Sequence, residues 1–290
     1  MFKDLFRSKQ KYVTVKPASV KREIPDGMWS KCNKCGQIIY SKELASNLKV
    51  CHKCGYHFKL SALERIALTV DADSFTEFDS ELLSINPLGF PGYEEKIKNG
   101  KNATSLSEAI LTGQAKICDF PVVIGAMDFG FMGASMGSVV GERVTRSFEF
   151  AVKHKLPVVM FCTSGGARMQ EGIVSLMQMV KTSAAVARFN EAGLLYISVL
   201  TNPTTGGVLA SFASLADIVL AEPEAQIGFA GPRVIEETMR QKLPPGFQTS
   251  EFVLAHGMID KIVERKNMRK TLGLLLSLHG SRVSEVALCE

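Results

Sequence analysis

Two pairs of adjacent glycines follow apolar segments in the second half of the chain. Gly165-Gly166 comes directly after PVVMFCTS, and Gly206-Gly207 comes shortly after LLYISVLT. A hydrolase would place a nucleophilic serine at such a turn in a Gly-x-Ser-x-Gly pattern, which is absent from both turns. Glycine lets a ligand approach the backbone closely, and two N–H groups directed at one point form an oxyanion hole. The glycines therefore predict that the backbone stabilises a negatively charged oxygen.

The two glycine pairs occupy matching positions. Each follows a strand-like segment and precedes a helical one, and the pairs lie about 40 residues apart. Either pair alone is explained by a tight turn that requires glycine. Because both junctions repeat one pattern, we favour a functional interpretation.

Four of the seven cysteines form two C-x2-C pairs, Cys32 with Cys35 and Cys51 with Cys54, with 15 residues between the pairs. This spacing is typical of a structural zinc site with four thiolate ligands. The alternative is two disulfides, which need an oxidising compartment, and the N-terminal segment lacks the apolar region of a secretory signal. We therefore predict one zinc ion. A closed four-cysteine site leaves no ligand position for His52 and His57, which we expect at the surface.

The composition is that of a globular protein with a sizeable core, since 46% of the 290 residues are apolar and 22% are charged. No apolar run approaches the ~20 residues of a membrane-spanning helix, and we expect a cytoplasmic protein. The first 70 residues hold 14 Lys and Arg against 5 Asp and Glu, whereas the remaining 220 hold 20 against 24. This asymmetry predicts two modules, of which the first is basic.

Strands and helices alternate behind the cysteine segment, which predicts an α/β fold with parallel strands. Apolar runs predict strands at 121–129, 157–164 and 194–201. The helix expected at 138–154 has apolar residues at helical spacing, namely Val140, Val144, Phe148 and Ala151. The helix expected at 173–193 has a similar face, formed by Ile173, Met177, Val180, Ala184 and Ala187. The segment 86–105 is rich in Gly, Pro, Lys and Asn, and is predicted to be a surface loop.

Long segments of the chain resemble one known family. They are SGGARMQEG, TNPTTGGVLASFASLADIVLAEPEAQIGFAGPRVIEET, LPPGFQTSEFVLAHGMIDKIV, MGASMGSVVGERVTRSFE and the four-cysteine segment. From about Trp29 to the C-terminal helix, the chain resembles the β subunit of the bacterial and plastid acetyl-CoA carboxylase carboxyltransferase. The resemblance implies a crotonase-like (ClpP/crotonase) α/β spiral of ββα units behind a small zinc ribbon. The implied domains are a basic tail at 1–27, the ribbon at 28–60 and the carboxyltransferase domain at 61–290.

The resemblance also implies a reaction and partners. In this family a carboxyl group moves from carboxybiotin on a carrier protein to acetyl-CoA, and the malonyl-CoA product serves fatty acid biosynthesis. The freed biotin nitrogen takes the proton, so the protein supplies oxyanion holes for the thioester enolate and the biotin ureido oxygen. A chain of this length has room for one crotonase-like domain. The implied partner is therefore an α subunit, in an α2β2 carboxyltransferase that works with biotin carboxyl carrier protein and biotin carboxylase.

The same resemblance implies the site residues. Backbone N–H groups of Gly165, Gly166, Gly206 and Gly207 are the expected oxyanion donors, and it stays open which pair serves CoA and which serves biotin. Arg168 either forms a structural ion pair, which we favour, or contacts a CoA phosphate.

Two other functions stay open. An acyl-CoA hydratase or isomerase of the same fold could use Glu142 and Glu171 as bases. A nucleic-acid-binding protein could use the basic ribbon, and the binding would then depend steeply on salt. The lysines that would contact nucleic acid, or offset the charge of a four-thiolate zinc site, are Lys31, Lys34, Lys49 and Lys53.

Overall fold

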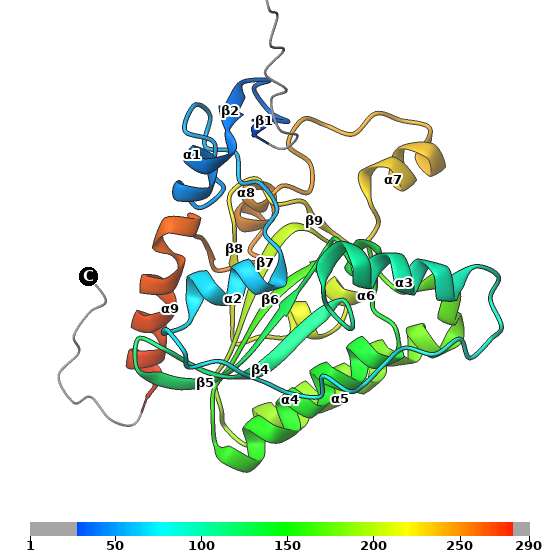
Figure 1. Ribbon diagram of the computed structural model, residues 1–290, viewed down its shortest axis with the longest axis vertical. Helices are drawn as coiled ribbons and strands as arrows, with labels where there is room; N and C mark the ends of the chain where they lie inside the picture. Colours follow the sequence, from blue (N-terminus) through cyan, green and yellow to red (C-terminus); the bar gives the residue numbers. More distant parts are fainter. Residues whose placement is uncertain (1–27, 281–290) are drawn as a thin grey trace, which may run out of the picture.

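The structure is a computed structural model that describes residues 28–280. An eight-stranded sheet forms the centre of the molecule (Figure 1). The predicted basic tail at 1–27 lies outside the described residues. The strand order is β10-β8-β7-β6-β5-β4-β3, and β9 pairs with the far end of β7. The strands are β3 (Thr76–Glu77), β4 (Ile110–Ile117), β5 (Phe120–Met127), β6 (Val158–Ser164), β7 (Tyr196–Thr205), β8 (Ile218–Ala221), β9 (Ile227–Gly228) and β10 (Lys261–Ile262).

The centre of the sheet is parallel, as the alternating sequence predicts. Strands β5, β6, β7 and β8 run in one direction, and every residue of β6 is buried. A strand covered on both faces needs a continuous apolar run, which explains why 157–164 does not alternate with polar residues. The antiparallel β4–β5 hairpin is an addition that the sequence did not predict.

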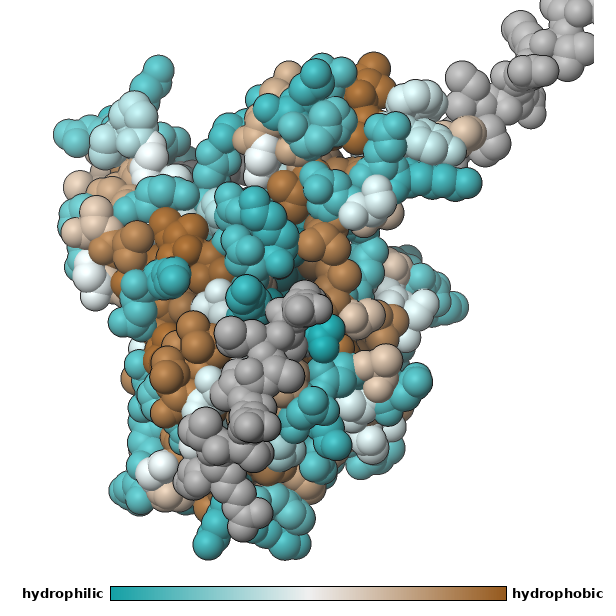
Figure 2. All heavy atoms as spheres, turned by 90° about the vertical axis from the view of Figure 1, so that its left-hand side faces the viewer, coloured by the Kyte–Doolittle hydropathy of each residue, from teal (hydrophilic) through white to brown (hydrophobic). Residues whose placement is uncertain are grey.

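Helices cover both faces of the sheet (Figure 1). Helices α4 (Ser138–His154) and α5 (Ile173–Glu191) enclose one core, and α2 (Ala62–Thr69) and α9 (Arg265–His279) enclose the other. Figure 2 faces the side of α9, where apolar patches alternate with hydrophilic residues. The remaining helical segments are α3 (Tyr93–Thr104), η1 (Met132–Ala134), η2 (Met169–Glu171), α6 (Gly206–Leu209), η3 (Phe212–Ser214), α7 (Pro232–Met239) and α8 (Ser250–Ala255).

Two expectations about the helices need correction. The apolar face of α4 is buried as its spacing suggests, but the corresponding residues of α5, from Ile173 to Ala187, are exposed. The segment 86–105 is only partly a loop, because α3 occupies 93–104. Tertiary packing overrides the composition there: Tyr93 is fully buried, and Gly100 lies against the ring of Phe131.

The segment predicted to be a zinc ribbon contains β1 (Trp29–Lys31), β2 (Ile38–Tyr40) and α1 (Ser41–Ser46). It lies at one end of the sheet, above α8 and β8 (Figure 1). Its buried apolar cluster is separate from the two cores of the body and includes Ile39 and Leu44. Among residues 28–280, no helix is long and apolar enough to cross a bilayer.

Candidate functional site

The two glycine pairs meet at the carboxyl ends of β6 and β7. These strands are parallel neighbours, with Ser164 opposite Thr204, so the turns that follow them lie side by side. A Cβ atom on Gly206 would lie 2.7 Å from the Cα of Gly166, and both glycines have positive φ, 61° and 119° respectively. Any other residue at 206 would collide with the neighbouring turn and would strain its own backbone. The structure therefore brings two matching junctions together in one site.

Three of the four expected N–H donors already have acceptors within the protein. The N–H of Gly165 donates to the Gly133 carbonyl at 2.8 Å, and that of Gly166 donates to the Ser164 hydroxyl at 2.9 Å. The N–H of Gly206 donates to the Phe229 carbonyl at 2.8 Å. The N–H of Gly207, near the start of α6, has no acceptor within residues 28–280. Gly207, which is buried, is thus the one of the four expected donors whose N–H has no acceptor in the described structure, and the roles of all four stay predictions.

An open groove of about 620 Å³ lies beside the glycine site. Its walls come from α3, η1 and the segment behind β6, where Gly165, Ala167 and Met169 line it. Lys96 of α3 lines the same groove. A concave site of this size is large enough for a substantial part of a cofactor-sized ligand.

The structure corrects the assignment of Arg168 to a CoA phosphate. Arg168 is 0% exposed, and its guanidinium forms a bidentate pair with Glu108 at 2.6 and 3.0 Å. It also donates to Tyr93 and to the backbone and side chain of Ser135. Burial alone would raise the pKa of Glu108, but Arg168 lowers it. The favoured ion-pair interpretation is confirmed, and Arg168 fixes the position of Ser135 in the wall of the groove.

The two carboxylates offered as bases are both engaged. Glu171 is buried and accepts hydrogen bonds from the Tyr93 hydroxyl and the Ser138 N–H, each at 2.6 Å. The second bond satisfies a backbone group at the start of α4. Glu142 lies on α4 and pairs with Arg146 and Lys181. Neither is a free base next to the glycine turns, which argues against the hydratase or isomerase alternative.

The four ribbon cysteines are arranged for a tetrahedral metal. Their sulfurs lie within 4.8 Å of one another and are not joined as disulfides. The Sγ atoms of Cys32 and Cys54 are 3.7 Å apart, and those of Cys35 and Cys51 are 3.8 Å apart. A tetrahedron with Zn–S bonds of ~2.3 Å has edges of about 3.8 Å, so the cluster fits zinc. The disulfide alternative is wrong for these four residues.

Two thiols of the cluster have pKa values shifted in opposite directions, and burial together with the neighbouring thiols raises the pKa of Cys54 to about 12. Burial would raise the pKa of the Cys32 thiol, but the backbone N–H groups of Cys35 and Lys34 and the neighbouring thiols lower it to about 7. Two of the ribbon lysines pair with carboxylates of the body, Lys34 with Glu224 and Lys49 with Glu64. Two of the four lysines that would contact nucleic acid therefore already pair with carboxylates of this chain.

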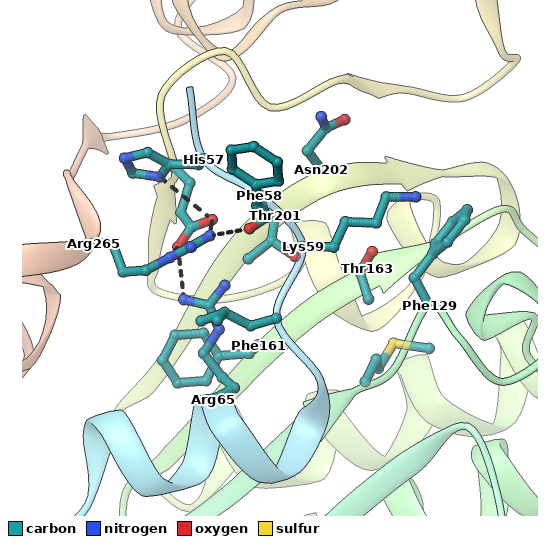
Figure 3. A pocket seen from close by; sticks show the side chains of 13 residues that line it. His57, Phe58, Lys59, Arg65, Phe129, Phe161, Thr163, Thr201, Asn202 and Arg265 are labelled. Atoms are coloured by element: carbon teal, nitrogen blue, oxygen red, sulfur yellow. Dashed lines mark hydrogen bonds and ion pairs between the residues drawn. The ribbon is translucent and has the colours of Figure 1, made fainter. Parts of the chain in front are cut away.

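A buried ion cluster attaches the ribbon to the body (Figure 3). Glu222 pairs with Arg65 of α2 at 2.6 Å and with Arg265 of α9 at 2.8 Å. Arg265 also donates to three backbone carbonyls in or just after the ribbon, those of Leu48, Lys49 and Phe58. Burial alone would raise the pKa of Glu222, but Arg65, His57 and Arg265 hold it well below its usual range. His57, which we expected at the surface, is buried here.

Sequence reasoning missed this cluster because its members are far apart in the chain. Arg65 and Glu222 are separated by 157 residues, and Arg265 and Leu48 by 217. None of these residues lies in a distinctive local motif, and they come together only when the chain folds.

Comparison with known proteins assigns the family. The model of the carboxyl transferase domain matches residues 57–246, and that of the acetyl-CoA carboxylase zinc finger domain matches residues 29–54. The acetyl-coenzyme A carboxylase carboxyl transferase subunit beta of Desulforamulus reducens is 59% identical over 97% of this chain and 100% of its own length. Its counterpart in Pelotomaculum thermopropionicum is 61% identical over 96% of this chain and 98% of its own length.

Solved structures of related enzymes share the fold. A crystal structure of transcarboxylase 12S matches with a TM-score of 0.67 and 25% identity, over 81% of this chain and 43% of that chain. A Pseudomonas malonate decarboxylase hetero-dimer shares the fold, with a TM-score of 0.57 and 22% identity over 73% of this chain and 84% of that chain. The predicted crotonase-like fold and transferase function are confirmed: the chain belongs to the family of acetyl-CoA carboxylase carboxyl transferase beta subunits.

Proposed function

We propose that this chain contributes the acyl-CoA side of a carboxyltransferase that moves a carboxyl group from carboxybiotin to acetyl-CoA and forms malonyl-CoA. The observation that carries the proposal is the pair of glycine turns at the ends of β6 and β7, with the Gly207 N–H unpaired in the described structure. Such a donor is suited to the oxygen of a thioester enolate. The groove beside Gly165 is suited to the CoA arm.

In this proposal, the residues of this chain bind the thioester and orient it for reaction. Gly207 donates its N–H to the thioester oxygen, whose negative charge grows as the enolate forms. Gly165, Gly166 and Gly206 hold the turn in shape through their present hydrogen bonds, and each can share its N–H with an oxyanion only by weakening such a bond. Biotin, carried by a separate protein, supplies the carboxyl group and the nitrogen that takes the proton.

We also propose that a second oxyanion hole comes from another chain. The two glycine pairs pack against each other, so together they build one site here. We propose that an α subunit with its own crotonase-like domain supplies the other hole, in an α2β2 assembly. In this proposal, biotin carboxyl carrier protein and biotin carboxylase complete the enzyme. The cytoplasmic location stays a prediction.

We further propose two units within the described chain, a ribbon at 28–60 and a carboxyltransferase domain that begins at 61. The separate apolar cluster around Ile39 supports the division. Ser61 also caps α2 through a reciprocal capping box with Glu64, which marks the start of a new element. One structural zinc ion per chain, bound by Cys32, Cys35, Cys51 and Cys54, would stabilise the ribbon.

The test is carboxyl transfer from malonyl-CoA to free biocytin by this chain together with an α subunit. We expect transfer that depends on both biocytin and malonyl-CoA. Hydration of crotonyl-CoA by the same preparation, without carboxyl transfer, would replace the proposal with the hydratase alternative. Binding to RNA or DNA that falls steeply with salt, without either reaction, would favour the ribbon-led alternative.

A further inference from the structure

The short strand β9 holds the second glycine turn from one side (Figure 1). Its two residues pair in parallel with the last two residues of β7. The residue after β9 is Phe229, whose carbonyl accepts the N–H of Gly206 at 2.8 Å. Because Gly207 follows Gly206 directly, the position of the Phe229 carbonyl determines how the Gly207 N–H is directed.

A strand of two residues is shorter than most strands and needs support from its neighbours. Gln248 supplies it on both sides of Phe229. The backbone carbonyl of Gln248 accepts the N–H of Ile227 at 2.8 Å. The side-chain Nε2 of Gln248 donates to the carbonyl of Ala230 at 3.0 Å. One residue therefore fixes the chain before and after the carbonyl that holds the glycine turn.

The structure is closely fitted around the Gln248 side chain. Gln248 is 8% exposed, and a Cβ on Gly228 would collide with its amide group. The backbone of Gln248 has a φ of 60°, in the left-handed region that favours glycine. Residues other than glycine that keep such a conformation are concentrated at functional sites. A glycine would relieve the strain but lose the amide, which indicates that the amide is what this position requires.

We propose that Gln248 is a positioning residue for carboxyl transfer. Its amide fixes residues 227–230, the Phe229 carbonyl holds the Gly206 N–H, and the Gly207 N–H is thereby directed at the thioester oxygen. This inference rests on the proposed function, because it names the support of the donor assigned there. Gln248 does not line the groove beside Gly165, so its effect passes through β9 and not through contact with the CoA arm.

A second glutamine in the same chain separates this role from simple stabilisation. Gln178 lies between α4 and α5, is 7% exposed, and donates from Nε2 to the Val174 carbonyl at 3.0 Å. Within residues 28–280, the Oε1 atoms of Gln178 and Gln248 both lack a hydrogen-bond partner. Loss of either amide therefore removes one buried hydrogen bond, but only Gln248 is bonded to the segment around β9.

The first experiment displaces the Gln248 amide without changing residue 248. Gly228→Ala pushes the end of this flexible side chain aside, and alanine fits the backbone there because the φ of Gly228 is not positive. Gly231→Ala, in the same segment, is the control, since nothing lies within 4 Å of its Cβ position.

Transfer from malonyl-CoA to biocytin is measured for each variant together with the α subunit. We expect the kcat of Gly228→Ala to fall at least about tenfold, with a KM for malonyl-CoA within about twofold of the wild type. The control should behave like the wild type. A raised KM with unchanged kcat would overturn the inference, because binding in the groove and not the donor would then have changed. An unchanged kcat would overturn it as well.

The second experiment removes the amide and follows the turn itself. Gln248→Met and Gln178→Met each keep a side chain of similar size, and hydrogen exchange of the full chain is followed by mass spectrometry. We expect peptides that contain Gly206 to exchange at least about tenfold faster in Gln248→Met, because less free energy is needed to open the bond to Phe229. Gln178→Met should leave these peptides unchanged.

Equal exchange of these peptides in the two methionine variants would contradict the positioning role. If Gln248→Met does not fold, exchange in Gly228→Ala takes its place, with Gly231→Ala as the control. A wild-type pair that transfers no carboxyl group would contradict the proposed function. The exchange of Gly206 would still show in that case whether Gln248 holds the turn.

Discussion

At Gly206 the backbone conformation and the neighbouring turn together exclude a side chain. A Cβ there would lie 2.7 Å from the Cα of Gly166, a backbone atom that cannot swing aside. We therefore expect Gly206→Ala to separate the two turns and displace the Gly207 N–H. The rate of carboxyl transfer by the α–β pair should fall about 100- to 1,000-fold, the usual effect of losing one oxyanion donor.

The matched control for this change is Gly257→Ala. Gly257 has a similar positive φ of 70°, but nothing lies within 4 Å of its Cβ position. The control should lose about 1 kcal/mol of stability through backbone strain and keep its activity. If both variants lost activity equally, strain rather than the collision of the turns would be responsible, and the assignment of the site would fail.

Arg168 belongs to the folded core rather than to substrate binding. Arg168→Met would leave the buried Glu108 without its partner, so we expect the free energy of unfolding to fall by about 3–5 kcal/mol in urea titrations. Arg146→Ala, at a partly exposed ion pair, should cost less than about 1 kcal/mol. A stable Arg168→Met protein with a selectively raised KM for the CoA substrate would instead restore the phosphate assignment.

The pKa of Glu108 adds a pH signature to the same pair. Because Arg168 lowers the folded-state pKa, the stabilisation is fully present above the unfolded value of about 4.3. It is lost as pH falls through the lower, folded-state value. In the Glu108→Gln variant, the free energy of unfolding should therefore fall less steeply than in the wild type as the pH drops below about 4.3. Urea titrations at several pH values measure this difference.

At the scale of elements, α9 holds the ribbon through one side chain. Arg265 joins Glu222 to ribbon carbonyls, whereas Arg269, one turn further along, forms an exposed pair with Asp71. We expect Arg265→Ala to cost about 3–5 kcal/mol and to speed amide hydrogen exchange in residues 28–60. Arg269→Ala should leave the exchange of the ribbon unchanged. Equal exchange in the two variants would contradict the anchoring role.

The ribbon also carries its own spectroscopic probe, because Trp29 is the only tryptophan of the chain. Its ring lies 5.4 Å from that of Tyr40 in the β1–β2 hairpin. Removal of zinc by a chelator should unfold the small ribbon core and shift the Trp29 emission, while most of the far-UV circular dichroism persists. An emission spectrum that is identical with and without zinc would argue against a zinc-dependent ribbon.

The sequence predicted the parallel strands, the main helices, the cysteine cluster and the glycine turns, because each has a local pattern. It did not predict α3, whose Gly- and Lys-rich segment becomes helical only with Tyr93 buried against the body. It located the apolar face of α5 but not the side to which that face turns. Periodicity shows which residues share a face, whereas neighbouring elements or another chain decide what covers it.

At the scale of the whole molecule, the described chain presents one pair of packed glycine turns. These turns provide one site, and an open groove lies beside them. In our proposal a second chain supplies the other hole. The central claim is therefore that this chain holds half of a carboxyltransferase site.

The most direct measurement of that claim is carboxyl transfer between malonyl-CoA and free biocytin, with this chain alone and mixed with the α subunit at equal concentration. We expect transfer in the mixture and almost none from this chain by itself. Full activity from the purified chain alone would contradict it, because a single chain would then contain both oxyanion holes.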